Sequence, residues 1–372
     1  MPPLEAWEKV LMSVDALFDI YGSGEQYSAH GRLSCVDCHG GTNEDDMAIA
    51  HEGVVRDPSK AEISACADCH YQHVPMQAAS LHYTLEGYIT VLQARWDPAQ
   101  IGVIDTVMDN HCASCHASCG QCHVSQPASA GGGLLDEHTF KKTPPMSRTC
   151  TGCHGSRIKN EFSGRNEGYP ADVHLRSARM ACVACHTNDE MHGVGVESNH
   201  RYDGDQTPRC ENCHVETVED ESNAYHANHV ETLSCQTCHS ITYKNCYNCH
   251  VQQSDEGVPY FDIDDSEMGF YIGLNPIVSE ERPYKYVPLR HVPISRESFA
   301  FYGEDLLSNF DARPTWTYAT PHNIQLQTPQ TASCMTCHDS LEWFLTADKV
   351  LPDELTANQA LIVETVPEMG EE

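Results

Sequence analysis

The segment NHCASCHASCGQCHVSQ, residues 110–126, contains four cysteines and three histidines. The pattern Cys-x-x-Cys-His occurs in it twice, from Cys112 to His116 and from Cys119 to His123. This is the pattern of covalent haem attachment, because two cysteines at this spacing reach two vinyl groups at one porphyrin edge and the next imidazole reaches the iron. The segment therefore predicts two haems almost in contact, with His111 left to ligate a third iron.

The same pattern uses every cysteine of the chain. The 372 residues contain 20 Cys and 23 His. The ten copies are Cys35/Cys38/His39, Cys66/Cys69/His70, Cys112/Cys115/His116, Cys119/Cys122/His123, Cys150/Cys153/His154, Cys182/Cys185/His186, Cys210/Cys213/His214, Cys235/Cys238/His239, Cys246/Cys249/His250 and Cys334/Cys337/His338. Zinc ribbons also use Cys-x-x-Cys pairs, but zinc does not require the following His. We therefore predict ten covalently bound haem c groups with these histidines as proximal ligands of iron, and no cysteine left for a disulfide or a nucleophile.

These motifs resemble those of the multihaem c-type cytochromes, here a decahaem one, over residues 35–338. The resemblance implies haem attachment after export, hence an extracellular or periplasmic location after signal peptide removal. Charged residues interrupt the apolar stretch that an export signal would need near residues 5–19, so we expect the numbering to begin after cleavage. No run approaches the roughly 18 apolar residues of a membrane-spanning helix, which predicts no transmembrane segment.

Histidines outside the motifs are the candidates for the second axial position of each iron. Thirteen remain, enough for ten bis-His haems, and none of the 11 Met is needed. The ten predicted distal ligands are His30, His51, His82, His111, His138, His174, His192, His226, His229 and His322. His226 and His229 are expected on one short helix, where they can serve two different irons. We expect His73, His200 and His291 not to be ligands.

The formal net charge of −32 excludes some classes of partner. Nucleic-acid binding needs clustered Lys and Arg, and only 22 are spread along the chain, so no nucleic acid and no anionic membrane surface is expected. Acidic clusters at residues 43–46 and 262–267 match no calcium loop, which favours solvated charge over a calcium site.

The predicted fold is mainly loops and short α-helices organised around the haems, with little β-sheet and the haem chain as the core. We expect an N-terminal helix and lead-in at 1–34, a nine-motif region at 35–250, an insertion without Cys at 251–333, and the tenth motif, a C-terminal helix and an acidic tail at 334–372. Helical segments are predicted at 4–18, 80–94, 99–110 and 340–350.

The insertion at 251–333 holds 12 of the 29 aromatic residues. Alternation at Tyr284/Tyr286 and Phe299/Phe301 predicts short strands or extended arms. Two interpretations stay open, a small subdomain packed on its own aromatic side chains or an arm that wraps a haem or an adjacent subunit.

Ten haems in a chain with an expected radius of gyration of roughly 21 Å cannot be isolated from one another. We therefore expect an electron carrier rather than an enzyme, with redox partner proteins or extracellular metal acceptors, and no folded apoprotein. The sequence is similar to extracellular cytochromes of metal-reducing microbes, some of which polymerise into conductive filaments, so a homopolymer is one expectation. The alternative is a multihaem oxidoreductase of the tetrathionate reductase or hydroxylamine oxidoreductase kind with one substrate-binding haem, although no motif ends in Lys.

Overall fold

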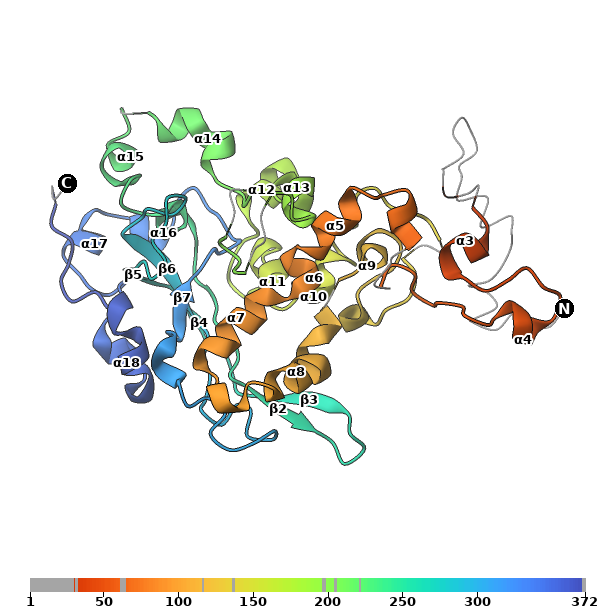
Figure 1. The fold of residues 1–372 in the computed structure, drawn as a ribbon. Coiled ribbons are helices and arrows are strands. Elements are labelled where there is room, and N and C mark those ends of the chain that lie inside the picture. The colour runs from red at the N-terminus through yellow and green to blue at the C-terminus, as the bar shows by residue number, and fades with distance from the viewer. Residues whose placement is uncertain are drawn as a thin grey trace. The chain divides into compact units, whose positions relative to one another are not determined.

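The computed structural model describes His30 and residues 33–60, 65–115, 117–135, 138–195, 199–203, 206–220 and 222–369 (Figure 1). The helix expected over residues 4–18, and His116, lie outside these described residues. The chain forms two compact units. Unit 1 comprises Met1–Leu85, Ser114–Cys153 and Thr187–Gly204, and unit 2 comprises Glu86–Ala113, His154–His186 and Asp205–Glu372.

Unit 1 is built from short helices joined by loops. They are α3 (Cys35–His39), α4 (Met47–Ala50), α5 (His73–Ala78), α6 (Leu81–Thr84), α9 (Cys119–His123), α10 (Cys150–Cys153) and α13 (Asn188–Met191). Among its described residues only three apolar side chains are buried, namely Leu85, Ala117 and Leu135. The described residues of unit 1 therefore form almost no apolar core of their own.

The described residues of unit 2 contain nine α-helices, two of which are the longest described in the chain. They are α7 (Glu86–Arg95), α8 (Val103–Val107), α11 (Ile158–Phe162), α12 (Val173–Ala178), α14 (Glu211–Val218), α15 (Ala224–His229), α16 (Cys235–His239), α17 (Met335–His338) and α18 (Leu355–Asn358). The helices expected over 80–94 and 99–110 are present as the shorter pieces α6, α7 and α8, followed by a further helical turn at Met108–Cys112.

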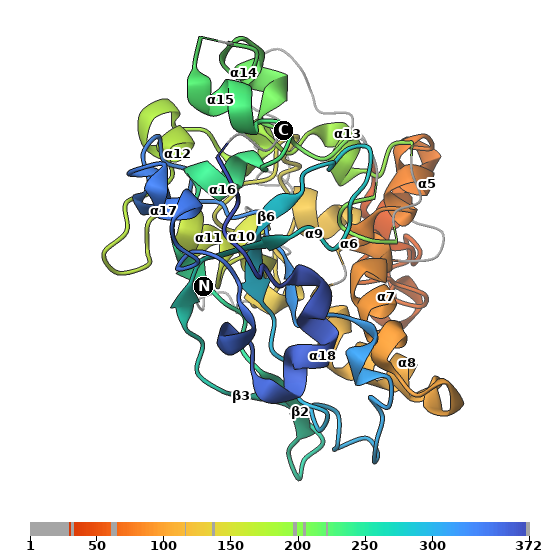
Figure 2. The same cartoon turned by 90° about the vertical axis from the view of Figure 1, so that its left-hand side faces the viewer.

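Unit 2 also contains every strand of the described residues, and each pairing is antiparallel. The strands are β1 (Tyr243–Lys244), β2 (Cys249–Gln253), β3 (Pro259–Ile263), β4 (Met268–Gly269), β5 (Tyr271–Leu274), β6 (Tyr286–His291) and β7 (Trp316–Tyr318). They form the pairs β1-β4 and β2-β3 and the sheet β5-β6-β7. In two views the β2-β3 hairpin projects from the body of unit 2 (Figures 1 and 2).

An aromatic core lies on the three-stranded sheet. Its buried members are Tyr243, Phe270, Ile272, Tyr286, Ala319, Phe344 and Val363. Phe270, Ile272, Tyr286 and Ala319 come from residues 251–333, whereas Tyr243, Phe344 and Val363 come from outside this segment. The segment therefore packs together with its flanking residues, and the two interpretations stay open. The alternation at Tyr284/Tyr286 leads into β6, whereas Phe299 and Phe301 lie in turns rather than in a strand.

The prediction of a helix at 340–350 was wrong. This segment contains turns and only a short 3-10 helix at Ala347–Lys349, and the last α-helix is α18. Phe344 and Leu345 are buried, and Leu345 exchanges backbone contacts with β5, where its N–H donates to the Ile272 carbonyl at 2.8 Å. Pairing with the sheet edge therefore overrides the helical propensity of this segment.

Gly273 in β5 is a position where even one methyl group should be costly. A Cβ there would clash with Leu289 Cδ1 and lie 2.8 Å from the Leu361 carbonyl oxygen, and Leu289 is fully buried. We expect Gly273→Ala to lower the free energy of unfolding of the protein by about 1–3 kcal/mol. Gly102→Ala, with no atom within 4 Å of the new Cβ, is the control. Equal denaturant midpoints for the two variants would contradict this packing.

In the part of the chain that the structure describes, no helix is long and apolar enough to cross a membrane.

Candidate haem-binding site

Most Cys-x-x-Cys-His motifs adopt a helical turn. Residues at i, i+3 and i+4 of a helix share one face, so this turn presents both thiols and the imidazole to the same side. In motifs that do not lie wholly within an α-helix, the turn still closes through the backbone. The His N–H donates to the carbonyl of the first Cys at 2.8 Å in His70, 2.9 Å in His186 and 3.1 Å in His338. These motifs therefore offer three side chains to one porphyrin.

Serine before the motif helps to start the turn. Ser34 and Ser118 have extended backbone angles at the N-caps of α3 and α9. Their N–H groups donate to the third helical residue, to Asp37 Oδ2 at 2.6 Å and to Gln121 Oε1 at 3.1 Å. This is the capping-box arrangement, which satisfies backbone groups at a helix start.

Seven of the predicted attachment cysteines are exposed in the polypeptide. They are Cys35, Cys69, Cys153, Cys185, Cys213, Cys249 and Cys334, and the other thirteen are half-buried. Cysteine is ordinarily among the most buried residue types. The physical reason for the difference is that these thiols lie on short turns or at a strand end, where too little polypeptide packs beside them to cover them. The expectation that the haem chain forms the core stays a prediction, and a porphyrin attached at these thiols would cover them.

The ninth motif departs from the helical turn. Cys249 and His250 are the first residues of strand β2, in register with Ile263 and Asp262 of β3. Successive side chains of a strand point to opposite faces. Cys249 and His250 therefore diverge, and this motif fits a single porphyrin less well than the others do.

Seven motif histidines face a second histidine ring from elsewhere in the same unit. The pairs and their ring-centre distances are His39–His138 at 6.1 Å, His70–His30 at 6.0 Å, His123–His192 at 6.2 Å, His186–His322 at 6.2 Å, His214–His174 at 6.0 Å, His239–His226 at 6.3 Å and His338–His229 at 6.1 Å. The second member of each pair is one of the ten predicted distal ligands.

The ring-centre distances of the seven pairs, 6.0–6.3 Å, can be compared with the distance expected for two imidazoles that bind one metal ion. Imidazole nitrogens bind a metal ion at about 2.0 Å, so two imidazoles on opposite sides of one ion have their ring centres roughly 6.3 Å apart. Rings in van der Waals contact would be nearer, as His30 and Phe140 are, at 3.9 Å. The ring-centre distances of the seven pairs match this spacing.

Hydrogen bonds orient many of these rings in the same way. Nδ1 lies 2.7–3.2 Å from a carbonyl or carboxylate oxygen in nine histidines, namely His39, His51, His123, His174, His192, His226, His229, His239 and His338. Because those oxygens only accept, Nδ1 must carry the proton. Nε2 then keeps its lone pair, and this is the arrangement by which proteins orient metal-binding histidines.

His226 and His229 lie on one short helix, as predicted, and each faces a different motif histidine. Both lie on α15, at i and i+3, and they face two different motif histidines, His239 and His338. Carbonyl oxygens of Thr217 and Tyr225 hold their Nδ1 atoms at 2.8 Å. One short helix therefore contributes to two sites.

The remaining three predicted distal ligands, His51, His82 and His111, are not members of the seven pairs. His51 follows α4 and is exposed, with Nδ1 held by the Met47 carbonyl at 2.7 Å. The His82 carbonyl accepts the Ala117 N–H at 2.9 Å, beside the third motif. His111 is buried, and its Nε2 lies 2.9 Å from the Tyr302 hydroxyl.

The three histidines predicted not to be ligands differ among themselves. His73 lies near two rings, 6.2 Å from His70 and 5.6 Å from His192. His200 accepts the Tyr202 N–H at its Nδ1, which is the reverse of the ligand arrangement. Nε2 of His291 lies 2.8 Å from a Glu354 carboxylate oxygen.

Electrostatics favours the neutral form of the imidazoles in several pairs. Removal from water and the neighbouring charge of His186 lower the pKa of His322 to about 4. Burial lowers the pKa of His30, with His70 as a second cause, and burial also lowers the pKa of His192. A neutral imidazole is the form that binds metal, so these rings are ready as ligands near pH 7.

Exposed apolar side chains lie in or next to the motifs. They are Leu33, Tyr71, Val183, Val215 and Met335, with exposures between 41% and 68%. Large apolar groups are favoured by burial, at roughly 25 cal/mol per Å². A porphyrin attached to the adjacent cysteines would cover them, so these surfaces also fit haem.

A buried ion pair that contacts the backbone of His322 was not predicted from the sequence. Glu161 in α11 is 1% exposed and pairs with the Arg290 guanidinium of β6. It also accepts the His322 backbone N–H at 3.0 Å. These contacts join residues more than 120 positions apart, and no spacing or motif signals them.

No family model, curated protein or solved structure gives a significant match to the chain. Among the described residues, no group of three or more His, Cys, Asp or Glu side chains is arranged to hold a metal ion.

Proposed function

We propose that this protein is an extracellular or periplasmic multihaem c-type cytochrome that carries electrons through ten closely spaced haems. The observation that carries the proposal is the set of seven facing histidine pairs, each joining a Cys-x-x-Cys-His motif to a distant imidazole at 6.0–6.3 Å. When bound, haem supplies a one-electron couple at its iron, and two axial imidazoles favour electron transfer over substrate binding.

Cysteines of different motifs lie in contact, which supports close spacing. Cys66 and Cys119 share a hydrogen bond, and so do Cys115 and Cys153. Each cysteine would be attached to a porphyrin edge, so these contacts support a close approach of haem edges between the second and fourth motifs and between the third and fifth, as electron transfer requires.

Electron paramagnetic resonance of the oxidised, haem-loaded protein tests this proposal, together with a redox titration of its absorption bands. The seven pairs predict mainly low-spin signals of bis-imidazole haem and reversible reduction over a broad range of potential. Mainly high-spin haem, or a protein that a small soluble reductant cannot reduce and reoxidise, would contradict an electron carrier.

Removing one distal histidine should change the spin state of one haem. His229→Ala leaves His338 without its facing ring, so we expect one additional high-spin haem per chain and the others unchanged. His200→Ala is the matched control, because the His200 Nδ1 accepts a backbone N–H and is not set up as a ligand. If both substitutions leave the low-spin count unaltered, His229 is not an axial ligand.

A further inference from the structure

Asp172 is a buried carboxylate of unit 2 that contacts one of the facing histidines. Its side chain is 2% exposed, and its Oδ1 accepts a hydrogen bond from Nδ1 of His174 at 3.1 Å. In eight of the nine histidines whose Nδ1 is held at 2.7–3.2 Å, the acceptor is a backbone carbonyl, and in His174 it is this carboxylate. His174 faces the motif histidine His214 with ring centres 6.0 Å apart. A negatively charged group therefore lies behind the distal imidazole of this pair.

Backbone N–H groups hold the Asp172 carboxylate in this position. Asp172 is the N-cap of α12, and its Oδ1 accepts the N–H groups of His174 and Leu175 at 2.7 and 3.4 Å. Its Oδ2 accepts the N–H of Ile324, from a distant part of the chain, at 2.7 Å. Both oxygens are therefore fixed, and the contact with the imidazole does not depend on a mobile side chain.

Two other pairs of unit 2 provide the comparison. Both rings of His226–His239 and both rings of His229–His338 have Nδ1 on a backbone carbonyl, and we call these the carbonyl-held pairs. A carboxylate on Nδ1 makes the other ring nitrogen more basic than a neutral carbonyl does, because it carries a full negative charge. A more basic axial ligand stabilises ferric iron more than ferrous iron and so lowers the reduction potential.

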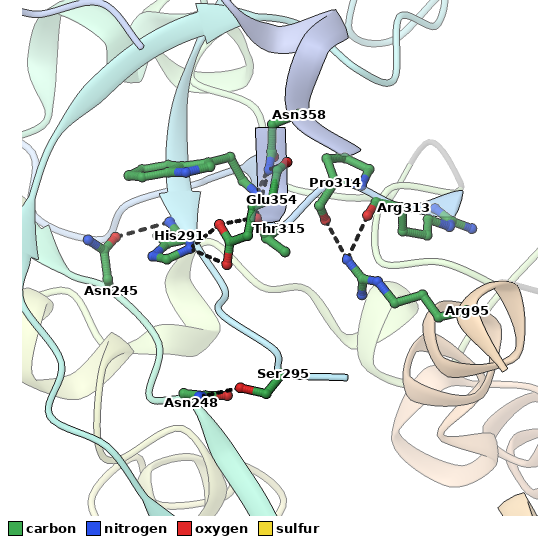
Figure 3. Close-up of polar contacts among 11 residues, drawn as sticks. Arg95, Asn245, Asn248, His291, Ser295, Arg313, Pro314, Thr315, Glu354 and Asn358 are labelled. Carbon is green, nitrogen blue, oxygen red and sulfur yellow. Dashed lines mark hydrogen bonds and ion pairs between the residues drawn. The ribbon is translucent and has the colours of Figure 1, made fainter. Parts of the chain in front are cut away.

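His291 also contacts a buried carboxylate of unit 2, but through its other nitrogen (Figure 3). Its Nε2 lies 2.8 and 3.1 Å from the two oxygens of Glu354. Glu354 is 3% exposed and also accepts the Thr315 hydroxyl at 2.6 Å. The carboxylate therefore occupies the nitrogen that the facing rings keep for metal. In His174 the carboxylate holds Nδ1 instead, so Nε2 keeps its lone pair for a metal ion.

From these contacts we propose that Asp172 is a positioning residue that acts through His174. It makes the iron held between His174 and His214 harder to reduce than the irons of the two carbonyl-held pairs. This inference rests on the proposed haem loading and adds to it an order of potentials within unit 2. The site beside Asp172 is the last of the three to accept an electron and the first to give one up.

A redox titration of the full haem-loaded chain tests this order, with electron paramagnetic resonance of samples frozen at set potentials. His174→Ala identifies the low-spin signal of this iron, and His226→Ala and His229→Ala identify the signals of the carbonyl-held pairs. In the wild-type protein, the His174 signal should persist to lower potential than the other two. This comparison needs no substitution of Asp172.

Asp172→Asn tests the carboxylate itself. Asn is as good a helix cap as Asp, so α12 should keep its start. We expect the equilibrium constant for reducing the His174 site to rise roughly tenfold, which raises its potential by about 59 mV for one electron. The matched control is Glu354→Gln, which removes a buried carboxylate from a histidine outside the seven pairs and should leave the potential of the His174 site unchanged.

The inference is overturned if the His174 signal titrates together with or above the signals of the carbonyl-held pairs, and the electron-carrier proposal then stays intact. An unchanged potential in Asp172→Asn, or an equal rise in Glu354→Gln, would also overturn it. A full set of low-spin signals in His174→Ala would show that His174 is no ligand and would have the same consequence. A chain that carries no haem would remove both proposals.

Discussion

Without haem, unit 1 is expected not to fold at all. Its described residues bury only three apolar side chains, whereas unit 2 has an aromatic core on a three-stranded sheet. Ordering a residue costs roughly 1–2 kcal/mol of backbone entropy, which three buried side chains cannot offset over the length of unit 1. We therefore expect the proposed porphyrins to supply its core, as a metal does in domains that are unfolded without it.

Hydrogen exchange read by mass spectrometry measures this difference between the units. We expect amides of α5, α6 and α9 to exchange slowly in the haem-loaded protein and at the rate of an unfolded peptide in the haem-free chain. Residual protection in the haem-free chain should be confined to β5, β6 and β7 of unit 2. Equal protection of α9 with and without haem would show that unit 1 needs no cofactor core.

Replacing Glu161 by Gln should destabilise unit 2 strongly. The substitution keeps the shape of the side chain but leaves the Arg290 guanidinium, which lies 4.8 Å over the Tyr243 ring, without its anionic partner. Removing one partner of a buried ion pair costs about 3–5 kcal/mol. Because Glu161 also accepts the His322 N–H, the His322 ring opposite His186 should shift and alter the signal of one low-spin haem.

The control for Glu161→Gln is Asp311→Asn. Asp311 lies 3.7 Å from Arg296, and both side chains are more than 40% exposed. Exposed ion pairs contribute about 0.2–1 kcal/mol, so denaturant unfolding should separate the two variants clearly. Equal losses would mean that the Glu161 pair is no more important than a surface contact.

The cysteines and histidines of the Cys-x-x-Cys-His motifs were the most predictable residues of this chain. Cys-x-x-Cys-His is a local pattern, so its cysteines and histidines follow from the sequence alone. The surplus of histidines identified the candidates for distal ligands, and seven of the ten face a motif histidine. Which ring faces which was not predictable, because the partners come together only through the fold. His322 and His186, for example, are separated by more than 130 residues.

The exposure of individual thiols was not predictable either. Cys69, Cys185 and Cys213 are the second cysteines of their motifs and are exposed, whereas Cys122 and Cys238, at the same place in theirs, are half-buried. The motif is the same in all five, so the difference comes from how much of the remaining chain packs beside each turn. A local pattern carries no information about that packing.

Long-range packing also explains what else the sequence did not predict. The segment at 340–350 has helical periodicity, but burial of Phe344 beside Ile272 draws it into an extended contact with the sheet. In the same way, pairing with Pro259–Ile263 places Cys249 and His250 in a strand, although the ninth motif is identical in spacing to the others. Glu161 and Arg290 show no local signal because neither belongs to a motif.

The intact mass of the protein tests the central claim most directly. Covalent haem survives denaturation, so a chain with ten attached haems should exceed its polypeptide mass of 41.3 kDa by ten haem masses after unfolding in acid. Tryptic peptides should carry haem on both cysteines of each motif. A polypeptide of unmodified mass, or one that holds zinc and loses it to a chelator, would contradict this interpretation of the ten motifs.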